Sequence, residues 1–190
     1  KEDDEKDNQI NTKKKQKNKK KRIALVLSGQ PRFYSSHGSD SMKRHVIDQY
    51  NADVFFHVWW SKDQVGSSYS VAPWTGLRTG PNTSQVQIED NLIDRLLSLY
   101  RPIAYEFEPQ RTQPGGGRNE GAQGGKAIDP LNSYLARNLP DILYSVARAG
   151  ALKVNYETSH GFKYDIVVKA RFDMFLGNFP NLFHLPMGED

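Results

Sequence analysis

Residues 23–32 read Ile-Ala-Leu-Val-Leu-Ser-Gly-Gln-Pro-Arg and contain the clearest fold signal in the chain. Five apolar residues follow one another, and a serine, a glycine and a proline then end the run. A short apolar run that is rich in branched residues and ends abruptly is typical of a strand buried on both faces, as in a parallel sheet. Residues 53–60 (DVFFHVWW) repeat this pattern, so we expect a second buried strand there.

Helices and further strands alternate with these two strands. Apolar residues at helical spacing predict three helices, over residues 41–50, 88–100 and 139–156, with Pro140 near the first turn of the third. Residues 103–107 alternate like a strand nearer the edge of a sheet. Residues 164–176 indicate an apolar, buried strand that becomes charged at its far end. This order predicts an α/β fold, with a mostly parallel sheet covered by helices on both faces.

Composition and charge exclude several classes of protein. The chain has 190 residues, of which 37% are hydrophobic, so it can form one domain with a core. The absence of cysteine excludes a disulfide scaffold, an Fe–S cluster, a thiolate zinc site and a thiol nucleophile. No apolar run approaches the roughly 20 residues of a transmembrane helix. Residues 23–190 carry about one net negative charge, which argues against specific nucleic-acid binding by the folded part.

The positive charge of the chain is concentrated at its beginning. Residues 1–22 hold ten basic and five acidic side chains and almost no apolar ones. We therefore expect a disordered lysine-rich tail over residues 1–21, followed by one domain over residues 22–190. A solubilising leader is the simplest interpretation of the tail. The alternatives are a nuclear-localisation signal, a patch for RNA or anionic lipid, and the stem of a membrane-anchored protein.

The location of the protein follows from the same features. Membrane association is expected only through the basic tail. A cytoplasmic location is expected, with the lumen of the secretory pathway as the alternative if an anchor was removed upstream.

Polar residues follow the first predicted strand, at Ser28, Gly29, Gln30 and Arg32. In open α/β sheets, ligands bind outside the carboxyl ends of the strands. Gly29 allows a tight turn that exposes backbone N–H groups, and Arg32 offers a guanidinium fork for a phosphate or a carboxylate. An ordinary turn with a surface arginine is the alternative interpretation.

Charged residues end the last predicted strand. Alternation places Lys169, Arg171 and Asp173 on one face, and buried charge is costly unless it is paired. Asp173 could therefore hold Mg²⁺ or Mn²⁺ beside a cationic group that faces phosphate oxygens. The alternative is a structural pair of Arg171 and Asp173. His57, within an aromatic strand, is interpreted as a hydrogen-bonded core residue, with a ligand or a base as the alternative.

Four pieces of the chain, taken in order, resemble a known group of enzymes. They are RIALVLSGQPR at residues 22–32, NADVFFHVW at residues 51–59, the pair Tyr144-Ser145 on a predicted helix, and YDIVVKARFD at residues 164–173. Together they are similar to the nucleotide-binding half of GT-A-like glycosyltransferases from large DNA viruses and microbes. The resemblance covers about residues 22–176.

The resemblance implies a GT-A-like, Rossmann-like fold and an enzyme that transfers a sugar from a nucleotide-sugar donor to a glycan or protein acceptor. It implies that Asp173 binds a divalent cation, Mn²⁺ or Mg²⁺, at the donor pyrophosphate. Arg171 replaces the first carboxylate of the common Asp-x-Asp motif, so metal-free neutralisation of the phosphates is the alternative. The donor-binding residues implied are Ser28, Gly29, Gln30, Arg32, Tyr144, Ser145 and Arg171.

Part of such an enzyme is expected to lie beyond this chain. GT-A enzymes usually place acceptor-binding and catalytic groups further along, so we expect a partial chain and assign no catalytic residue. Two other functions stay open. One is a non-catalytic nucleotide- or sugar-binding domain, and the other is a protein that associates with RNA or membranes through its basic tail.

Overall fold

The computed structural model describes six segments of the chain, at residues 21–31, 37–66, 68–69, 86–109, 130–177 and 179–185. Most of the predicted tail, Arg32 and the glycine-rich stretch before the third predicted helix lie outside the described residues.

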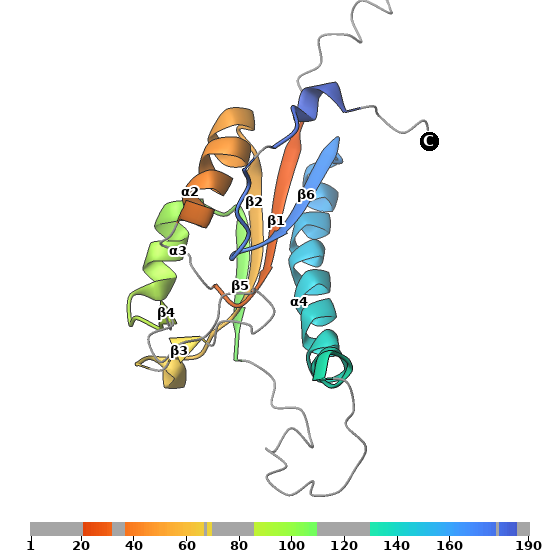
Figure 1. The fold of residues 1–190 in the computed structure, drawn as a ribbon. Coiled ribbons are helices and arrows are strands. Elements are labelled where there is room, and N and C mark those ends of the chain that lie inside the picture. The colour runs from red at the N-terminus through yellow and green to blue at the C-terminus, as the bar shows by residue number, and fades with distance from the viewer. Residues whose placement is uncertain are drawn as a thin grey trace, which may run out of the picture.

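A four-stranded parallel sheet forms the centre of the structure (Figure 1). Its strands are β1 (Ile23–Gly29), β2 (Asp53–Trp59), β5 (Ala104–Glu108) and β6 (Ile166–Arg171), in the spatial order β5-β2-β1-β6. The two continuous apolar runs form the central strands, because only a strand covered on both faces can bury every side chain. The prediction of a parallel α/β sheet is confirmed.

Helices cover both faces of the sheet, as predicted (Figure 1). On one face lie α2 (His37–Met42), its continuation η1 (Lys43–Asp48), which is wound as a π-helix, and α3 (Leu92–Tyr100). On the other face lies α4 (Pro130–His160), which packs against β1, β2 and β5. No helix in the described segments is both long and apolar enough to cross a bilayer.

Short elements complete the described chain. They are η2 (Lys62–Gln64), the two-stranded antiparallel sheet of β3 (Ser68–Tyr69) and β4 (Val86–Gln87), and η4 (Leu182–His184).

The hydrophobic core is divided unequally between the two faces of the sheet. The face under α2, η1 and α3 is apolar throughout, with Phe56, Leu92 and Leu96 among its fully buried side chains. The α4 face has a smaller apolar cluster around Phe55 and Ala24, near the amino ends of the strands. Polar side chains replace apolar ones toward the carboxyl ends of the strands on this face, as described below.

The third helix was predicted to begin at Leu139, and this prediction was wrong. The helix α4 begins at Pro130, and Pro140 lies in its interior rather than in its first turn. Proline is favoured in a first turn because its missing N–H has no helical partner there. An interior proline removes one hydrogen bond, but in a 31-residue helix the neighbouring turns continue on both sides.

The strand predicted over residues 164–176 is shorter than expected and lies at an edge. β6 ends at Arg171, so Asp173 lies in the turn that follows the strand rather than on it. One side of β6 pairs with β1, and no described strand pairs with the other side. Val167 is therefore 37% exposed. The apolar sequence of this segment had predicted a buried strand, and this prediction was wrong.

Glu157 connects the last turns of α4 to the start of β6. Its buried carboxylate accepts hydrogen bonds from Lys153 Nζ at 2.7 Å and from the Tyr164 backbone N–H at 2.9 Å. Burial alone would raise the pKa of Glu157, but these bonds outweigh it and the pKa is lowered.

We expect Glu157→Gln to lower the free energy of unfolding by about 1–3 kcal/mol at pH 7, the range for a lost bond to a charged group. Because the pKa is lower in the folded state, this stabilisation is present above the unfolded pKa of about 4.3 and is lost as the pH falls through the folded pKa. Urea unfolding at pH 7 and pH 3 measures this stabilisation. The free energy of unfolding of the variant should be lower than that of the native chain only at pH 7. An equal difference at both pH values would contradict a role for the carboxylate charge.

Candidate functional site

The order of the strands reverses between β1 and β6. The chain passes from β1 to β2 and β5 on one side, and α4 then returns it to β6 on the other side of β1. In sheets of this kind, ligands bind outside the carboxyl ends of the strands at this switch point. Ser28 on β1 and Arg171 on β6 are register partners here, so two of the predicted donor-binding residues lie side by side.

Gly29, the last residue of β1, has a backbone conformation that favours glycine. Gly29 has φ of 105°, a conformation that glycine adopts readily and other residues rarely do. Ser28 is buried, and Gln30 is half-buried. Residues 32–36, Arg32 among them, lie outside the described residues, so the tight turn expected here stays a prediction.

Arg171 and Asp173 form a two-pronged ion pair at the end of β6. Arg171 Nε donates to Asp173 Oδ1 at 2.9 Å, and Nη2 donates to Oδ2 at 2.6 Å. The side chain of Arg171 is 48% exposed, so the pair lies near the surface rather than in the core. Both carboxylate oxygens thus already contact a cation. A metal ion at Asp173 stays a prediction.

A row of polar side chains crosses the sheet from Ser28. His57 on β2 is the register partner of Ser28, and Glu106 on β5 is the register partner of His57. Register partners in a parallel sheet point to the same face. The contact of His57 with Ser145 shows that this face is the one covered by α4. Arg171, Ser28, His57 and Glu106 therefore form one row, near the carboxyl ends of all four strands.

His57 lies at the centre of this row and is fully buried. Its Nδ1 is 2.8 Å from Ser145 Oγ, and its ring meets Trp59 edge to face. Its Nε2 lies 3.8 Å from Glu108 Oε2, too far for a hydrogen bond, and has no hydrogen-bond partner. Burial lowers the pKa of His57, although the nearby carboxylates of Glu108 and Glu106 oppose the shift. The prediction of a hydrogen-bonded core histidine is confirmed for Nδ1 only.

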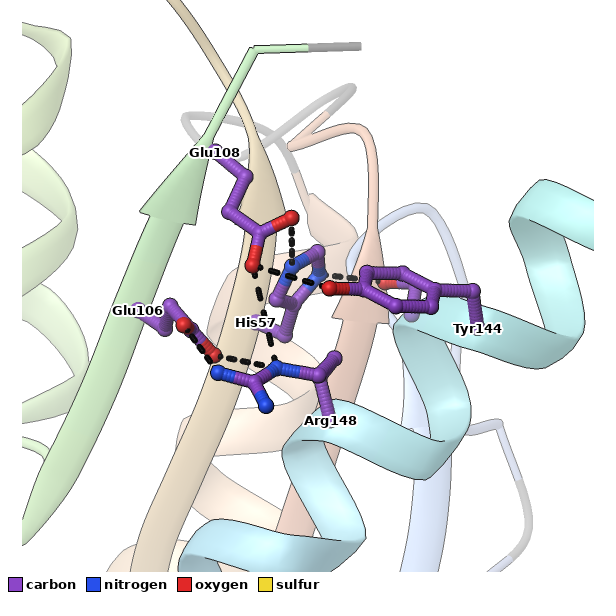
Figure 2. A network of polar contacts seen from close by, with 6 residues as sticks. His57, Glu106, Glu108, Tyr144 and Arg148 are labelled. Carbon is purple, nitrogen blue, oxygen red and sulfur yellow. Dashed lines mark hydrogen bonds and ion pairs between the residues drawn. The ribbon is translucent and has the colours of Figure 1, made fainter. Parts of the chain in front are cut away.

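Two side chains of α4 reach the carboxylates of β5 (Figure 2). Tyr144 Oη donates to Glu108 Oε1 at 3.1 Å, and the ring of Tyr144 stacks on Trp59. Arg148 Nε donates to Glu106 Oε2 at 3.0 Å, and Arg148 Nη2 donates to the other oxygen of Glu106. The Arg148 guanidinium holds the pKa of Glu106 below its usual value.

Tyr144 and Ser145 thus have definite partners beyond the predicted contact with a sugar. Ser145 contacts His57 in the polar row, and Tyr144 contacts Glu108, two residues after Glu106 on β5. On α4, Ser145 and Ala149 are buried and begin a stripe that continues at the half-buried Leu152 and Tyr156. A hydroxyl group on such a stripe is a sequence signal for a buried polar partner.

Sequence reasoning missed Glu106, Glu108 and Arg148 as site residues. The sequence patterns that mark these residues are weak. Two glutamates occupy alternate positions of an edge strand, and the arginine follows Tyr144 by one helical turn. Alternation places both glutamates on one face of the strand, but only the fold shows that this face meets α4.

One group of described side chains could hold a metal ion. A ring nitrogen of His57 and one carboxylate oxygen each of Glu106 and Glu108 all lie within 4.8 Å of one another. Asp173 is not a member of any such group within the described segments. The described residues therefore offer two distinct candidate places for a cation, one at Asp173 and one at His57.

Comparison with known proteins gives no family for this chain. No protein-family model matches it, and no curated protein or solved structure matches it either.

Proposed function

We propose that this chain is the donor-binding domain of a glycosyltransferase, with a nucleotide sugar bound at the switch point between β1 and β6. One observation carries the proposal: Ser28 and Gly29 at the end of β1 lie beside Arg171 at the end of β6, at the place where parallel α/β sheets bind nucleotides. The sequence resemblance narrows the ligand to a nucleotide sugar, and the acceptor to a glycan or protein.

The proposed roles follow from charge and exposure. Backbone N–H groups around Gly29 and the side chains of Ser28 and Gln30 bind the nucleotide and its diphosphate. Arg171 is half-exposed and held in place by Asp173, so its guanidinium can contact phosphate oxygens without a large reorganisation. Negative charge grows on the departing diphosphate during sugar transfer, and a fixed cation beside it stabilises that charge.

Asp173 alone does not fit a metal site of the usual kind. Its two oxygens both accept from Arg171, and among the described residues it belongs to no group of three or more potential metal ligands. The proposed mechanism therefore relies on Arg171 for charge neutralisation and passes no step through a metal at Asp173.

Tyr144 is the better of the two predicted sugar-facing residues. Ser145 is 1% exposed and bonded to His57, whereas Tyr144 is half-buried at the carboxyl ends of β2 and β5. We therefore assign a donor contact to Tyr144 and a supporting contact to Ser145.

A thermal-shift screen of nucleotide sugars, with and without Mn²⁺, tests the proposal directly. A donor at about 100 times its dissociation constant should stabilise the folded chain by about 2.7 kcal/mol, which raises the melting temperature by several degrees. The free sugars, inorganic diphosphate and ATP are the matched controls. If no nucleotide sugar raises the melting temperature more than these controls do, the proposal is wrong.

Detection of sugar transfer separates the enzyme from its main alternative. A chain that binds a donor but releases no nucleotide with any glycan acceptor is a non-catalytic binding domain. Release of the nucleotide diphosphate, measured by a coupled assay, supports the enzyme.

A further inference from the structure

One ring nitrogen of the buried His57 side chain makes no hydrogen bond. His57 Nε2 is completely buried, has no hydrogen-bond partner, and points at Glu108 Oε2 from 3.8 Å. A buried nitrogen without a partner normally costs stability, so such an atom in a native site requires an explanation. Glu106 and Glu108 supply carboxylate oxygens beside it, within 4.8 Å (Figure 2).

We propose that His57, Glu106 and Glu108 bind a divalent transition metal of the Zn²⁺ class. This site is separate from Asp173 and does not depend on the proposed donor. Zn²⁺ binds imidazole nitrogens and carboxylate oxygens at about 2.0–2.2 Å, and water completes the coordination of a three-ligand site. An imidazole ligand favours Zn²⁺ and its neighbours over Mg²⁺ and Ca²⁺, which prefer oxygen ligands alone.

The distances fit a site that closes slightly around its ion. Two ligand atoms that each lie about 2.1 Å from a tetrahedral ion are about 3.4 Å apart. His57 Nε2 and Glu108 Oε2 are 3.8 Å apart, so a small rotation of the half-buried Glu108 side chain brings them to that distance. The imidazole itself need not move, because the core fixes it.

Ser145 holds the imidazole in the form that a metal requires. A ligating histidine uses one ring nitrogen for the metal and donates the N–H of the other to a neighbour. His57 Nδ1 lies 2.8 Å from Ser145 Oγ, so an Nδ1–H that donates to this oxygen leaves the Nε2 lone pair directed at the carboxylates. Ser145 is a positioning residue in this arrangement.

Arg148 provides the competing charge that the metal must overcome. Its guanidinium binds both oxygens of Glu106 and lies 3.7 Å from Glu108 Oε1. Glu106, Glu108 and Arg148 together carry a net charge of −1, and a bound divalent ion changes this net charge to +1. Each carboxylate oxygen has two lone pairs, so Glu106 can accept from Arg148 and contact an ion at the same time. The Arg148 side chain is 44% exposed and can also move into solvent.

Calorimetric titration of the chelator-treated full chain with Zn²⁺, and separately with Mg²⁺, tests the site. We expect one equivalent of Zn²⁺ to bind at least 10-fold more tightly than Mg²⁺. Ser145→Ala should weaken Zn²⁺ binding by about 10–100-fold, the usual effect of removing a partner of a ligating histidine. Glu108→Gln, which keeps the shape of a 23% exposed side chain and removes its charge, should weaken it at least as much. In the Co²⁺-loaded chain, NMR should show one paramagnetically shifted imidazole N–H, that of His57.

Two further variants separate this site from the alternatives. Asp94→Asn removes a carboxylate from an acidic surface group at the start of α3 and should leave the affinity for Zn²⁺ unchanged. Asp173→Asn should also leave it unchanged. The proposal is overturned by the absence of stoichiometric Zn²⁺ binding, by equal affinity in Glu108→Gln, or by loss of the site in Asp173→Asn.

Discussion

Replacing Phe56 with alanine should lower the free energy of unfolding by about 3–5 kcal/mol, the range for truncation of a buried phenylalanine. Phe56 is fully buried on β2, under the α3 face of the sheet. Its ring contacts those of Tyr100, Phe107 and Phe172, which belong to α3, β5 and the turn after β6. Removing it leaves a cavity between three elements that cannot all move inward together.

Phe175→Ala is the matched control for this prediction. The same atoms are removed from a side chain that is 66% exposed, so the change should stay within about 0.5 kcal/mol. Urea unfolding followed by circular dichroism compares the two variants. A loss below about 1 kcal/mol for Phe56→Ala would show that this core is loosely packed.

Arg171→Met should weaken donor binding by about 10–100-fold while the melting temperature changes little. The loss corresponds to one or two charge-assisted hydrogen bonds at about 1.5–3 kcal/mol. Stability should change little because the Arg171 side chain is 48% exposed, and pairs near the solvent contribute about 0–1 kcal/mol. Calorimetric titration with the nucleotide sugar found in the screen measures the affinity. Unchanged affinity would remove Arg171 from the donor site.

Asp173→Asn distinguishes the two remaining roles of the carboxylate. If Asp173 orients Arg171, the variant should bind the donor several-fold more weakly whether or not Mn²⁺ is present. If Asp173 is a metal ligand, the Mn²⁺-dependent part of donor binding should disappear and the metal-free part should remain. Titrations with and without Mn²⁺ give both values for one protein.

Several features of the fold could be predicted from the sequence because they depend on local patterns. Continuous apolar runs predicted two strands buried on both faces, and β1 and β2 are these strands. Alternation predicted an edge strand over residues 103–107, which became β5. The errors lie where tertiary contacts override local preference. Pro140 was predicted in the first turn of a helix but lies inside α4. The last strand was predicted to continue to Leu176 but ends at Arg171.

The candidate site shows the same division between sequence and fold. The residues themselves determined that charged groups lie at the end of the last strand, whereas the tight turn at Gly29 stays a prediction. Asp173 as a metal ligand and the glycosyltransferase function stay predictions. The sequence alone gave no reason to connect His57 with Glu106, Glu108 or Ser145.

The amino-acid sequence by itself determined the class of this protein, because burial periodicity is a property of neighbouring residues. It determined where the main strands and helices lie, apart from the start of α4 and the end of β6, and that the strands are parallel. Only the tertiary structure decided that Ser28, His57 and Glu106 share one row, and that α4 covers it. The physical reason is that the register of a parallel sheet joins residues about 30 to 140 positions apart through backbone hydrogen bonds, which carry no side-chain signature. A buried histidine facing two carboxylates is therefore visible only once the strands are paired.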